Sequence, residues 1–241
     1  MRIDRWMTSL GICSRSEGKT FVRQGRVQLN GATVKDPAAL CRPEQDQLQV
    51  DGVPVDGRLT RHLLLCKPEG VLTAARDPKQ PTVMDLLPPV YRAIGCMPIG
   101  RLDKDTTGLL LFSTDGELAH RLLSPRREVW KTYTATVDGP LGEDEITAFT
   151  RGVSMEGFDA LPAELEVTRS GPCGSSALIR VREGQFHQIK RMFHCVGCTV
   201  CTLRRIRFGS LSLPEEMQDG EWRELTETEH QLLCQDAGMI P

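Results

Sequence analysis

Apolar residues in this chain follow two different periods. Most fall in short runs rich in Leu, Val and Ile, which indicate strands, and two segments place them at helical spacing, GELAHRLL at 116–123 and QFHQIKRMFHCV at 185–196. Strands outnumber helices, and the turns between them are mostly too short for crossovers. We therefore predict an α+β fold with a mainly antiparallel mixed sheet flanked by helices. The expected strands are HLLLC at 62–66, VLTA at 71–74, GLLLFST at 108–114, VWKTYTATV at 129–137, ELEV at 164–167, ALIRVRE at 177–183 and TVCTLRRIRF at 199–208.

The first 58 residues predict a separate small domain of two helices and short strands. Ile3, Met7 and Leu10 have helical spacing, and RVQLNGATVK at 26–35 alternates around Asn-Gly, which indicates a hairpin. A second helix is expected to begin with a capping box of Ser14 and Glu17 and to end at Gly25. The stretch DGVPVDGRLT at 51–60 is interpreted as a linker. This gives domains at 1–58 and 59–241.

Charge is segregated along the chain although the net charge is only −2. Residues 1–35 carry seven Lys or Arg against two acids, and residues 184–214 carry five against none. Residues 215–241 carry eight acids and one Arg. A polyanion could therefore bind to one face of a nearly neutral protein.

The sequence predicts a cytoplasmic protein. Its apolar runs are far shorter than the roughly 20 residues of a membrane-spanning helix, and the start MRIDRW is charged where an export signal would be apolar. Nine cysteines in such a chain indicate reduced thiols. Cys195, Cys198 and Cys201 beside His194 imitate a metal site, but a helix end at Gly197 would separate their sulfurs. We expect no metal, and we expect Cys201 to point into the core.

Three polar motifs are the candidates for chemistry. GRLDKDTTG at 100–108 sets Asp103 beside Arg101 in a loop before an apolar strand, KTY occupies 131–133, and GQFHQIKRM at 184–192 is a basic segment. Each residue also has an ordinary structural interpretation: Asp103 as a loop cap, Tyr133 as a core aromatic and Lys190 as a surface lysine.

Taken together, these motifs resemble the RsuA family of pseudouridine synthases, and residues 1–58 resemble the S4 RNA-binding domain. The resemblance extends through KPEG at 67–70, PTVMDLL at 81–87, the whole stretch 100–133, EGQFHQIKRMF at 183–193 and GEWRELTETE at 220–229. It implies isomerisation of a uridine in 16S ribosomal RNA, of the type that modifies position 516, by a monomer without a cofactor. It also implies that Asp103 is the catalytic carboxylate, that Tyr133 stacks on the uracil, and that Lys190 is the buried cation paired with Asp103. The RNA contacts expected beside these are Arg101, His187 and Arg191 in the catalytic domain, and Arg15, Lys19, Arg23 and Arg26 in the S4-like domain.

The reaction itself explains why such residues are needed. Uridine isomerisation neither gains nor loses an atom. It requires an ionised carboxylate, a cation beside the carboxylate and a pocket for an extruded base. Whether Asp103 attacks C6, attacks C1′ or removes a sugar proton stays open at this point. Two alternatives also stay open: a 23S rRNA pseudouridine synthase, and a non-catalytic RNA-binding assembly factor. The DTTG at 105–108, the S4-like domain and the short tail favour the 16S enzyme.

Overall fold

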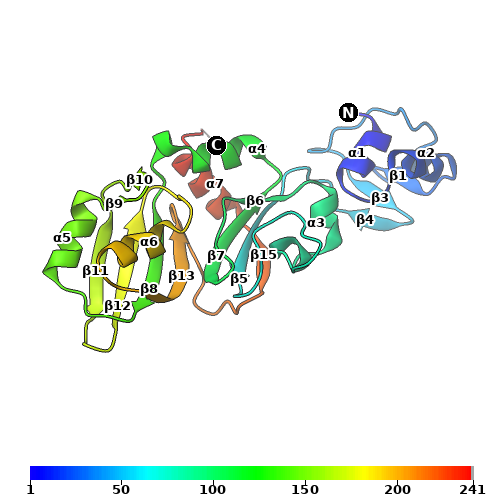
Figure 1. Cartoon of the computed structure of the whole chain (residues 1–241). Helices are drawn as coiled ribbons and strands as arrows, with labels where there is room; N and C mark the ends of the chain where they lie inside the picture. The colour runs from blue at the N-terminus through cyan, green and yellow to red at the C-terminus, as the bar shows by residue number, and fades with distance from the viewer. Residues whose placement is uncertain (240–241) are drawn as a thin grey trace. The chain divides into compact units, whose positions relative to one another are not determined.

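The chain forms two compact units in a computed structural model that describes residues 1–239 (Figure 1). One unit contains residues 1–61 together with 87–97, and the other contains residues 62–86 and those from 98 onward. The first unit therefore takes a short segment from the middle of the chain. No helix among the described residues is long and apolar enough to cross a membrane.

The N-terminal unit packs two helices against a small antiparallel sheet. Its core includes Ile3, Trp6, Met7 and Val22, which have no exposed surface. The sheet has the strand order β2-β1-β3-β4. The elements of this unit are α1 (Ile3–Ser9), α2 (Arg15–Arg23), β1 (Val27–Leu29), β2 (Ala32–Thr33), β3 (Leu48–Val50), β4 (Val53–Val55) and α3 (Pro89–Ala93).

Local sequence signals account for most of this unit. Ser14 and Glu17 form the predicted capping box of α2, and the β1–β2 hairpin turns at Asn30 and Gly31, whose φ angles are 53° and 81°. The linker prediction for 51–60 was wrong at its start. Residues 53–55 are strand β4, which pairs with β3 across a turn at Asp51-Gly52 with φ angles of 53° and 77°. Two positive φ angles in a two-residue turn match the twist of a hairpin.

The α3 segment, residues 87–97, belongs to this N-terminal unit. The α3 segment comes close to the N-terminal helices at Gly11. A Cβ built on Gly11 would lie 3.1 Å from the side chain of Ile94 and 3.3 Å from those of Ala93 and Val90. Residues 1–61 therefore do not make up the whole N-terminal unit, because residues 87–97 supply part of it.

The larger unit is built on one mixed sheet, as predicted, in the order β11-β12-β8-β13-β7-β5-β15. β14 pairs with β13 and β6 with β7, and β13 with β7 is the parallel pair. The strands are β5 (His62–Lys67), β6 (Met97–Ile99), β7 (Thr106–Ser113), β8 (Lys131–Val137), β11 (Glu164–Arg169), β12 (Ser175–Val181), β13 (Val200–Phe208), β14 (Leu211–Ser212) and β15 (Trp222–Glu224). A separate hairpin joins β9 (Ser154–Met155) and β10 (Phe158–Asp159).

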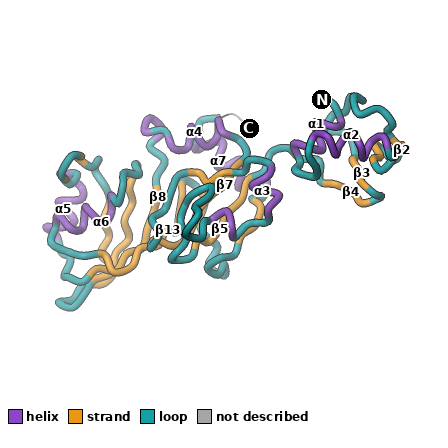
Figure 2. Tube along the Cα trace, turned by 45° about the vertical axis from the view of Figure 1, so that its right-hand side comes forward, coloured by secondary structure: helices purple, strands orange, loops and turns teal. Residues whose placement is uncertain are grey.

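Helices cover this sheet unevenly. α5 and α6 lie beside each other over β11, β12 and β8, whereas α4 and α7 lie together near β7 (Figures 1 and 2). Residues 63–66 and 109–112 are fully buried, so β5 and β7 have both faces covered. On β8 and β12, buried and more exposed residues largely alternate, so the face away from α5 and α6 carries the more exposed positions. The helices are α4 (Gly116–Leu123), α5 (Glu143–Arg151), α6 (Gln188–Cys195) and α7 (Glu227–Asp236), with short 3-10 turns at Val83–Asp85 and Pro125–Arg127.

One helix starts where it was predicted and another does not. α4 occupies the predicted residues 116–123, and its cap is the side chain of Asp115, which accepts from the backbone N–H groups of Glu117 and Leu118. α6 begins at Gln188, because His187 has a φ of 50° in the left-handed region and cannot continue the helix. His187 therefore lies at the N-cap of α6 rather than on its face.

Two strand predictions were also wrong in detail. VLTA at 71–74 is not a strand, and it has only an isolated bridge between Leu72 and Thr82. Cys201 is exposed rather than in the core. The register of β13 against β8 shifts between Val200 and Thr202, so Cys201 is the extra residue of a bulge and loses the expected orientation.

Gly108 makes the approach of β7 to β13 possible. Its φ is 96°, and a Cβ built there would lie 2.3 Å from the carbonyl oxygen of Arg205, a backbone atom. We expect Gly108→Ala to lower the free energy of unfolding by about 2–4 kcal/mol, from backbone strain added to a steric clash. Urea unfolding followed by circular dichroism would measure this. Gly116→Ala is the matched control because no atom lies within 4 Å of its Cβ position; equal midpoints for the two variants would contradict the prediction.

Candidate active site of the larger unit

The three sequence motifs meet at one pocket. It is formed by the loop before β7, by β8 and by the segment that leads into α6. Asp103, Tyr133 and Lys190 all contribute to its wall, as do Arg101 and His187. The other lining residues are Leu102, Thr106, Val181, Glu183, Gly184, Gln185, Gln188, Ile189 and Leu203.

Asp103 lies between the Lys190 ammonium and the His187 imidazole of the α6 segment. Its Oδ2 is 3.5 Å from Nζ of Lys190, and its Oδ1 is 3.6 Å from Nε2 of His187. The Asp103 side chain is 27% exposed, so the carboxylate is reachable from the pocket while remaining partly shielded. Both distances exceed that of a hydrogen bond, and the Asp103 oxygens face Lys190 and His187 without a direct bond to either.

Lys190 has a closer partner that the sequence analysis did not consider. Its Nζ donates a hydrogen bond to Oδ1 of Asp105, and this bond holds the pKa of Asp105 below its usual range. Lys190 therefore bridges two carboxylates of the same loop. It is 23% exposed rather than fully buried.

Tyr133 projects from β8 beside a buried arginine. The ring is 8% exposed, and the guanidinium carbon of Arg205 lies 6.0 Å from its centre. Arg205 is 2% exposed and donates from Nε to the carbonyl oxygen of Leu109 at 2.7 Å. The register pairs Arg205 directly with Tyr133 across β13 and β8. Arg205 thus fixes a positive charge behind the ring that faces the pocket.

Lys131, the first residue of KTY, is also buried near this arginine. It is 6% exposed and donates to the carbonyl oxygen of Arg182 at 3.2 Å. Burial, and secondarily the charge of Arg205, lowers the pKa of Lys131 to about 8.

The KPEG and VLTA segments hold the Asp103 loop in place. Nζ of Lys67 donates to the carbonyl oxygens of Pro68, Lys104 and Thr106 at 3.0, 3.2 and 2.9 Å. The backbone N–H of Gly70 donates to the same carbonyl of Lys104 at 2.8 Å. One buried ammonium therefore fixes the backbone on both sides of Asp105.

A second brace acts at Leu102, directly before the carboxylate. Oγ1 of Thr73 donates to the carbonyl oxygen of Leu102 at 2.7 Å and accepts from its N–H at 3.2 Å. These contacts explain why residues 71–74 (VLTA) do not form a strand: the hydroxyl group of Thr73 is hydrogen-bonded to the neighbouring loop.

The segment before α6 is ordered by a buried glutamine. Gln188 is 4% exposed, donates to Glu183 at 2.8 Å and accepts from the N–H of Gln185 at 3.1 Å. Phe186 projects from this segment with 72% of its surface exposed and stacks on His187 with the ring centres 3.8 Å apart. An exposed aromatic ring therefore stands beside the pocket.

Other predicted site residues lie outside the pocket. Arg191 does not line it and donates instead to the carbonyl oxygen of Glu156. Arg15, Lys19 and Arg23 are exposed on α2, whereas Arg26 is bonded to Asp51 at 2.6 and 2.8 Å and lies over the ring of Phe21. Within residues 1–239, no three His, Cys, Asp or Glu side chains are grouped so as to hold a metal ion.

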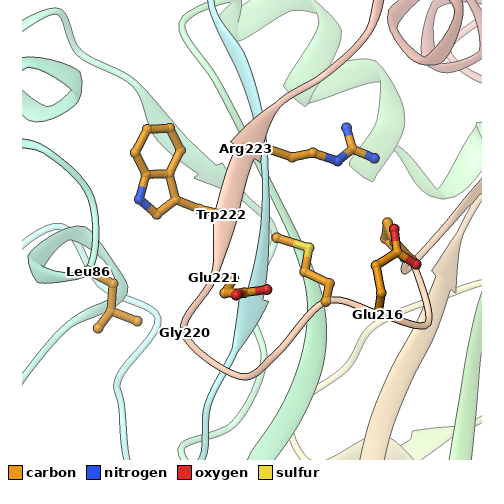
Figure 3. A pocket seen from close by; sticks show the side chains of 8 residues that line it. Leu86, Glu216, Gly220, Glu221, Trp222 and Arg223 are labelled. Carbon is orange, nitrogen blue, oxygen red and sulfur yellow. The ribbon is translucent and has the colours of Figure 1, made fainter.

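A larger hollow of about 540 Å³ lies at β15 (Figure 3). Trp222 and Arg223 point to opposite sides of this strand, and Glu216 and Glu221 project beside them. Arg223 is bonded to Glu229 by two hydrogen bonds of 2.7 Å. We place the chemistry in the smaller pocket, because there a carboxylate faces an ammonium group, an imidazole and an aromatic ring.

Comparison with known proteins shows the family of the chain. The model of the RNA pseudouridylate synthase family matches residues 61–195, and that of the S4 domain matches residues 1–48. The chain belongs to the RNA pseudouridylate synthase family. The first match confirms the resemblance that the motifs indicated, and the second identifies an S4 domain at the N-terminus.

Several relatives of this pseudouridylate synthase align along nearly all of its length. An uncharacterized RNA pseudouridine synthase of Bacillus subtilis is 40% identical, covering 97% of this chain and 98% of the relative. The ribosomal small subunit pseudouridine synthase A of Escherichia coli is 37% identical, covering 95% and 98%. A crystal structure of a pseudouridylate synthase superposes with a TM-score of 0.67 at 30% identity, covering 97% of this chain and 99% of that one.

The Lys67 brace should matter for catalysis by this synthase. We expect Lys67→Met to lower the rate at saturating RNA about 10- to 100-fold with little change in RNA affinity, because the Asp103 loop loses the hydrogen bonds to Lys104 and Thr106 and shifts. Single-turnover isomerisation and filter binding would measure the two quantities. A loss of affinity with an unchanged rate would contradict a positioning role.

Lys67 should also affect how stability depends on pH. Burial lowers the pKa of Lys67 from 10.5 to about 8, so between these values the unfolded chain binds a proton that the folded chain does not. The free energy of unfolding should therefore rise with pH across this window, and it should rise less in Lys67→Met, where Lys131 still contributes. Urea titrations from pH 7.5 to 10.5 measure this slope.

Proposed function

We propose that this protein isomerises a uridine to pseudouridine in 16S ribosomal RNA, as a monomer and without a cofactor. The observation that carries the proposal is the Asp103 carboxylate, held between Lys190 and His187 at a pocket that also contains Tyr133. The family supports the reaction class. Relatives named for the ribosomal small subunit support the choice of RNA.

The reaction rearranges bonds within one nucleotide. The bond from C1′ of the ribose to N1 breaks, the uracil turns, and C1′ bonds to C5. The C5 proton leaves and N1 gains a proton, so no atom is gained or lost. A carboxylate with nearby ammonium and imidazole groups suits this chemistry, because a neighbouring cation favours the ionised form that acts as nucleophile or base.

The pocket assigns a part to each of its side chains. Asp103 acts on the reacting nucleotide, and Lys190 holds the Asp103 loop through Asp105 while keeping a positive charge 3.5 Å from Asp103. Tyr133 stacks on the extruded uracil from a ring that Arg205 holds from behind. Extrusion is required because the reacting atoms of a stacked base are out of reach.

RNA capture is proposed for cations of both units. In the larger unit, Arg101 and His187 line the pocket beside Asp103, and we assign them contacts with the flanking phosphates. In the S4-like domain, residues 1–58, exposed Arg15, Lys19 and Arg23 are better placed for this role than Arg26, whose guanidinium is bonded to Asp51. Arg191 is engaged with a backbone carbonyl and serves the fold of the site.

Mapping pseudouridine in ribosomal RNA tests the proposal. Cells that lack this protein should lose one pseudouridine from 16S rRNA, and purified protein should restore it on RNA from those cells. A site lost from 23S rRNA instead would assign the related large-subunit activity. An unchanged map together with impaired subunit assembly would indicate the non-catalytic factor.

A further inference from the structure

A cluster of arginines lies on the opposite side of β8 from the pocket. We use the name arginine patch for Arg127, Arg180, Arg182 and Arg207 together with Trp130. Arg127, Arg180, Arg207 and Trp130 line a groove of about 310 Å³. This is some ten times the ~30 Å³ that a water molecule occupies in the liquid, so the groove is large enough for a chain segment.

The strand register places this patch on the reverse face of the sheet. Thr132 of β8 pairs with Arg180 of β12 and with Arg207 of β13, whereas the next residue, Tyr133, faces the pocket. Neighbouring strands are about 4.8 Å apart, which sets the backbones of the two arginines roughly 10 Å apart. A bulge between Arg205 and Arg207 sends Arg207 to this face, while Arg205 stays beside Tyr133 on the other face.

Trp130 holds two of the guanidinium groups in fixed positions. The guanidinium carbons of Arg180 and Arg182 lie 4.9 and 5.0 Å from its ring centre. Glu164 bonds Arg180 at 2.6 Å, and Glu128 bonds Arg182 at 2.8 Å. Arginines that are already ordered lose less conformational entropy when an anion binds.

The other two arginines remain available. Among residues 1–239, neither Arg127 nor Arg207 forms an ion pair with a carboxylate, and both side chains are exposed. Asp236, which also lines the groove, accepts two hydrogen bonds from Ser210 at 2.7 and 2.8 Å. The groove therefore presents two arginines without a carboxylate partner, one carboxylate that is bonded to a serine, and an ordered Arg-Trp-Arg cluster.

We propose that the arginine patch is an additional RNA-binding surface, which holds the phosphates of an RNA segment other than the one that carries the target uridine. Guanidinium groups bind phosphate oxygens in a bidentate manner, and arginines around an aromatic ring suit a single-stranded segment. The patch faces away from Tyr133, so one strand cannot occupy the pocket and the patch at neighbouring nucleotides. This inference rests on the proposed function for the identity of the polyanion.

The test compares two double variants of the full-length protein. Arg127→Gln with Arg207→Gln removes the two available charges of the patch, and Arg151→Gln with Arg169→Gln removes two exposed charges elsewhere in the same unit. Affinity for a 16S rRNA transcript is measured by filter binding from 50 to 300 mM KCl. Isomerisation is followed as tritium release at saturating RNA.

We expect the patch variant to bind about tenfold more weakly at low salt and its salt slope to fall by about 1.4–1.8, which corresponds to two lost phosphate contacts. The rate at saturating RNA should equal that of the wild type, because neither residue touches the pocket. The inference would be overturned if the patch variant had the same affinity and the same salt slope as the control variant, whether both match the wild type or both are reduced equally. If the wild type isomerises no uridine but the patch variant still loses affinity, the proposed reaction fails while the binding surface stands.

Discussion

Asp103→Asn should lower the single-turnover rate of uridine isomerisation by about 10³-fold or more, with RNA affinity almost unchanged. The amide keeps the size of the carboxylate but cannot serve as nucleophile or base. It also stays near Lys190 and His187, which lie 3.5 and 3.6 Å from the native oxygens, so the pocket should keep its shape. Tritium release from RNA labelled at uridine C5 measures the rate.

Asp105→Asn is the matched control for this variant. It removes a carboxylate two residues away in the same loop, which is bonded to Lys190 and is 60% exposed. We expect it to keep a substantial part of the activity, because Lys190 retains its interaction with Asp103. If Asp103→Asn turned over as well as Asp105→Asn, the catalytic role would not belong to Asp103.

Lys190→Met should reduce the rate at neutral pH by about 10²-fold. The variant removes the positive charge 3.5 Å from Asp103 and the hydrogen bond to Asp105, so the Asp103 loop loses a contact that positions it. Lys190→Arg should restore part of the rate, since it keeps the charge but alters the geometry.

Single-turnover rates at saturating RNA, measured together with RNA affinity, separate this role of Lys190 from RNA binding. Binding measured on the same RNA should change little, because Lys190 is occupied by Asp103 and Asp105. An unchanged rate at saturating RNA, together with weaker binding, would reassign Lys190 to phosphate recognition. Arg191→Met is a suitable comparison, since Arg191 follows on the same helix and lies outside the pocket lining.

Signals that act within a few residues were enough to predict much of this fold. The capping box at Ser14 and the Asn30-Gly31 turn depend on local geometry, and the structure has both. The candidate pocket residues could be proposed from the sequence because the motifs around Asp103, Tyr133 and Lys190 resemble a known family. That resemblance carries information about distant contacts that periodicity does not.

Long-range contacts explain what the sequence could not predict. The bond from Lys190 to Asp105 joins residues 85 positions apart, and the two bulges of β13 decide which of its arginines is buried. A regular strand would place Arg205 and Arg207 on one face. Instead, Arg205 supports Tyr133 and Arg207 faces the reverse side, and no pattern in TVCTLRRIRF reveals this.

The return of residues 87–97 to the N-terminal unit has a consequence for biosynthesis. A domain folds during translation only when all of its chain has left the ribosome. Residues 1–61 emerge first but lack α3, whose Val90, Ala93 and Ile94 contact the turn at Gly11. The RNA-binding unit therefore completes its fold only after β5 of the catalytic sheet has been synthesised. RNA capture by a nascent chain should accordingly begin late, once residue 97 is outside the exit tunnel.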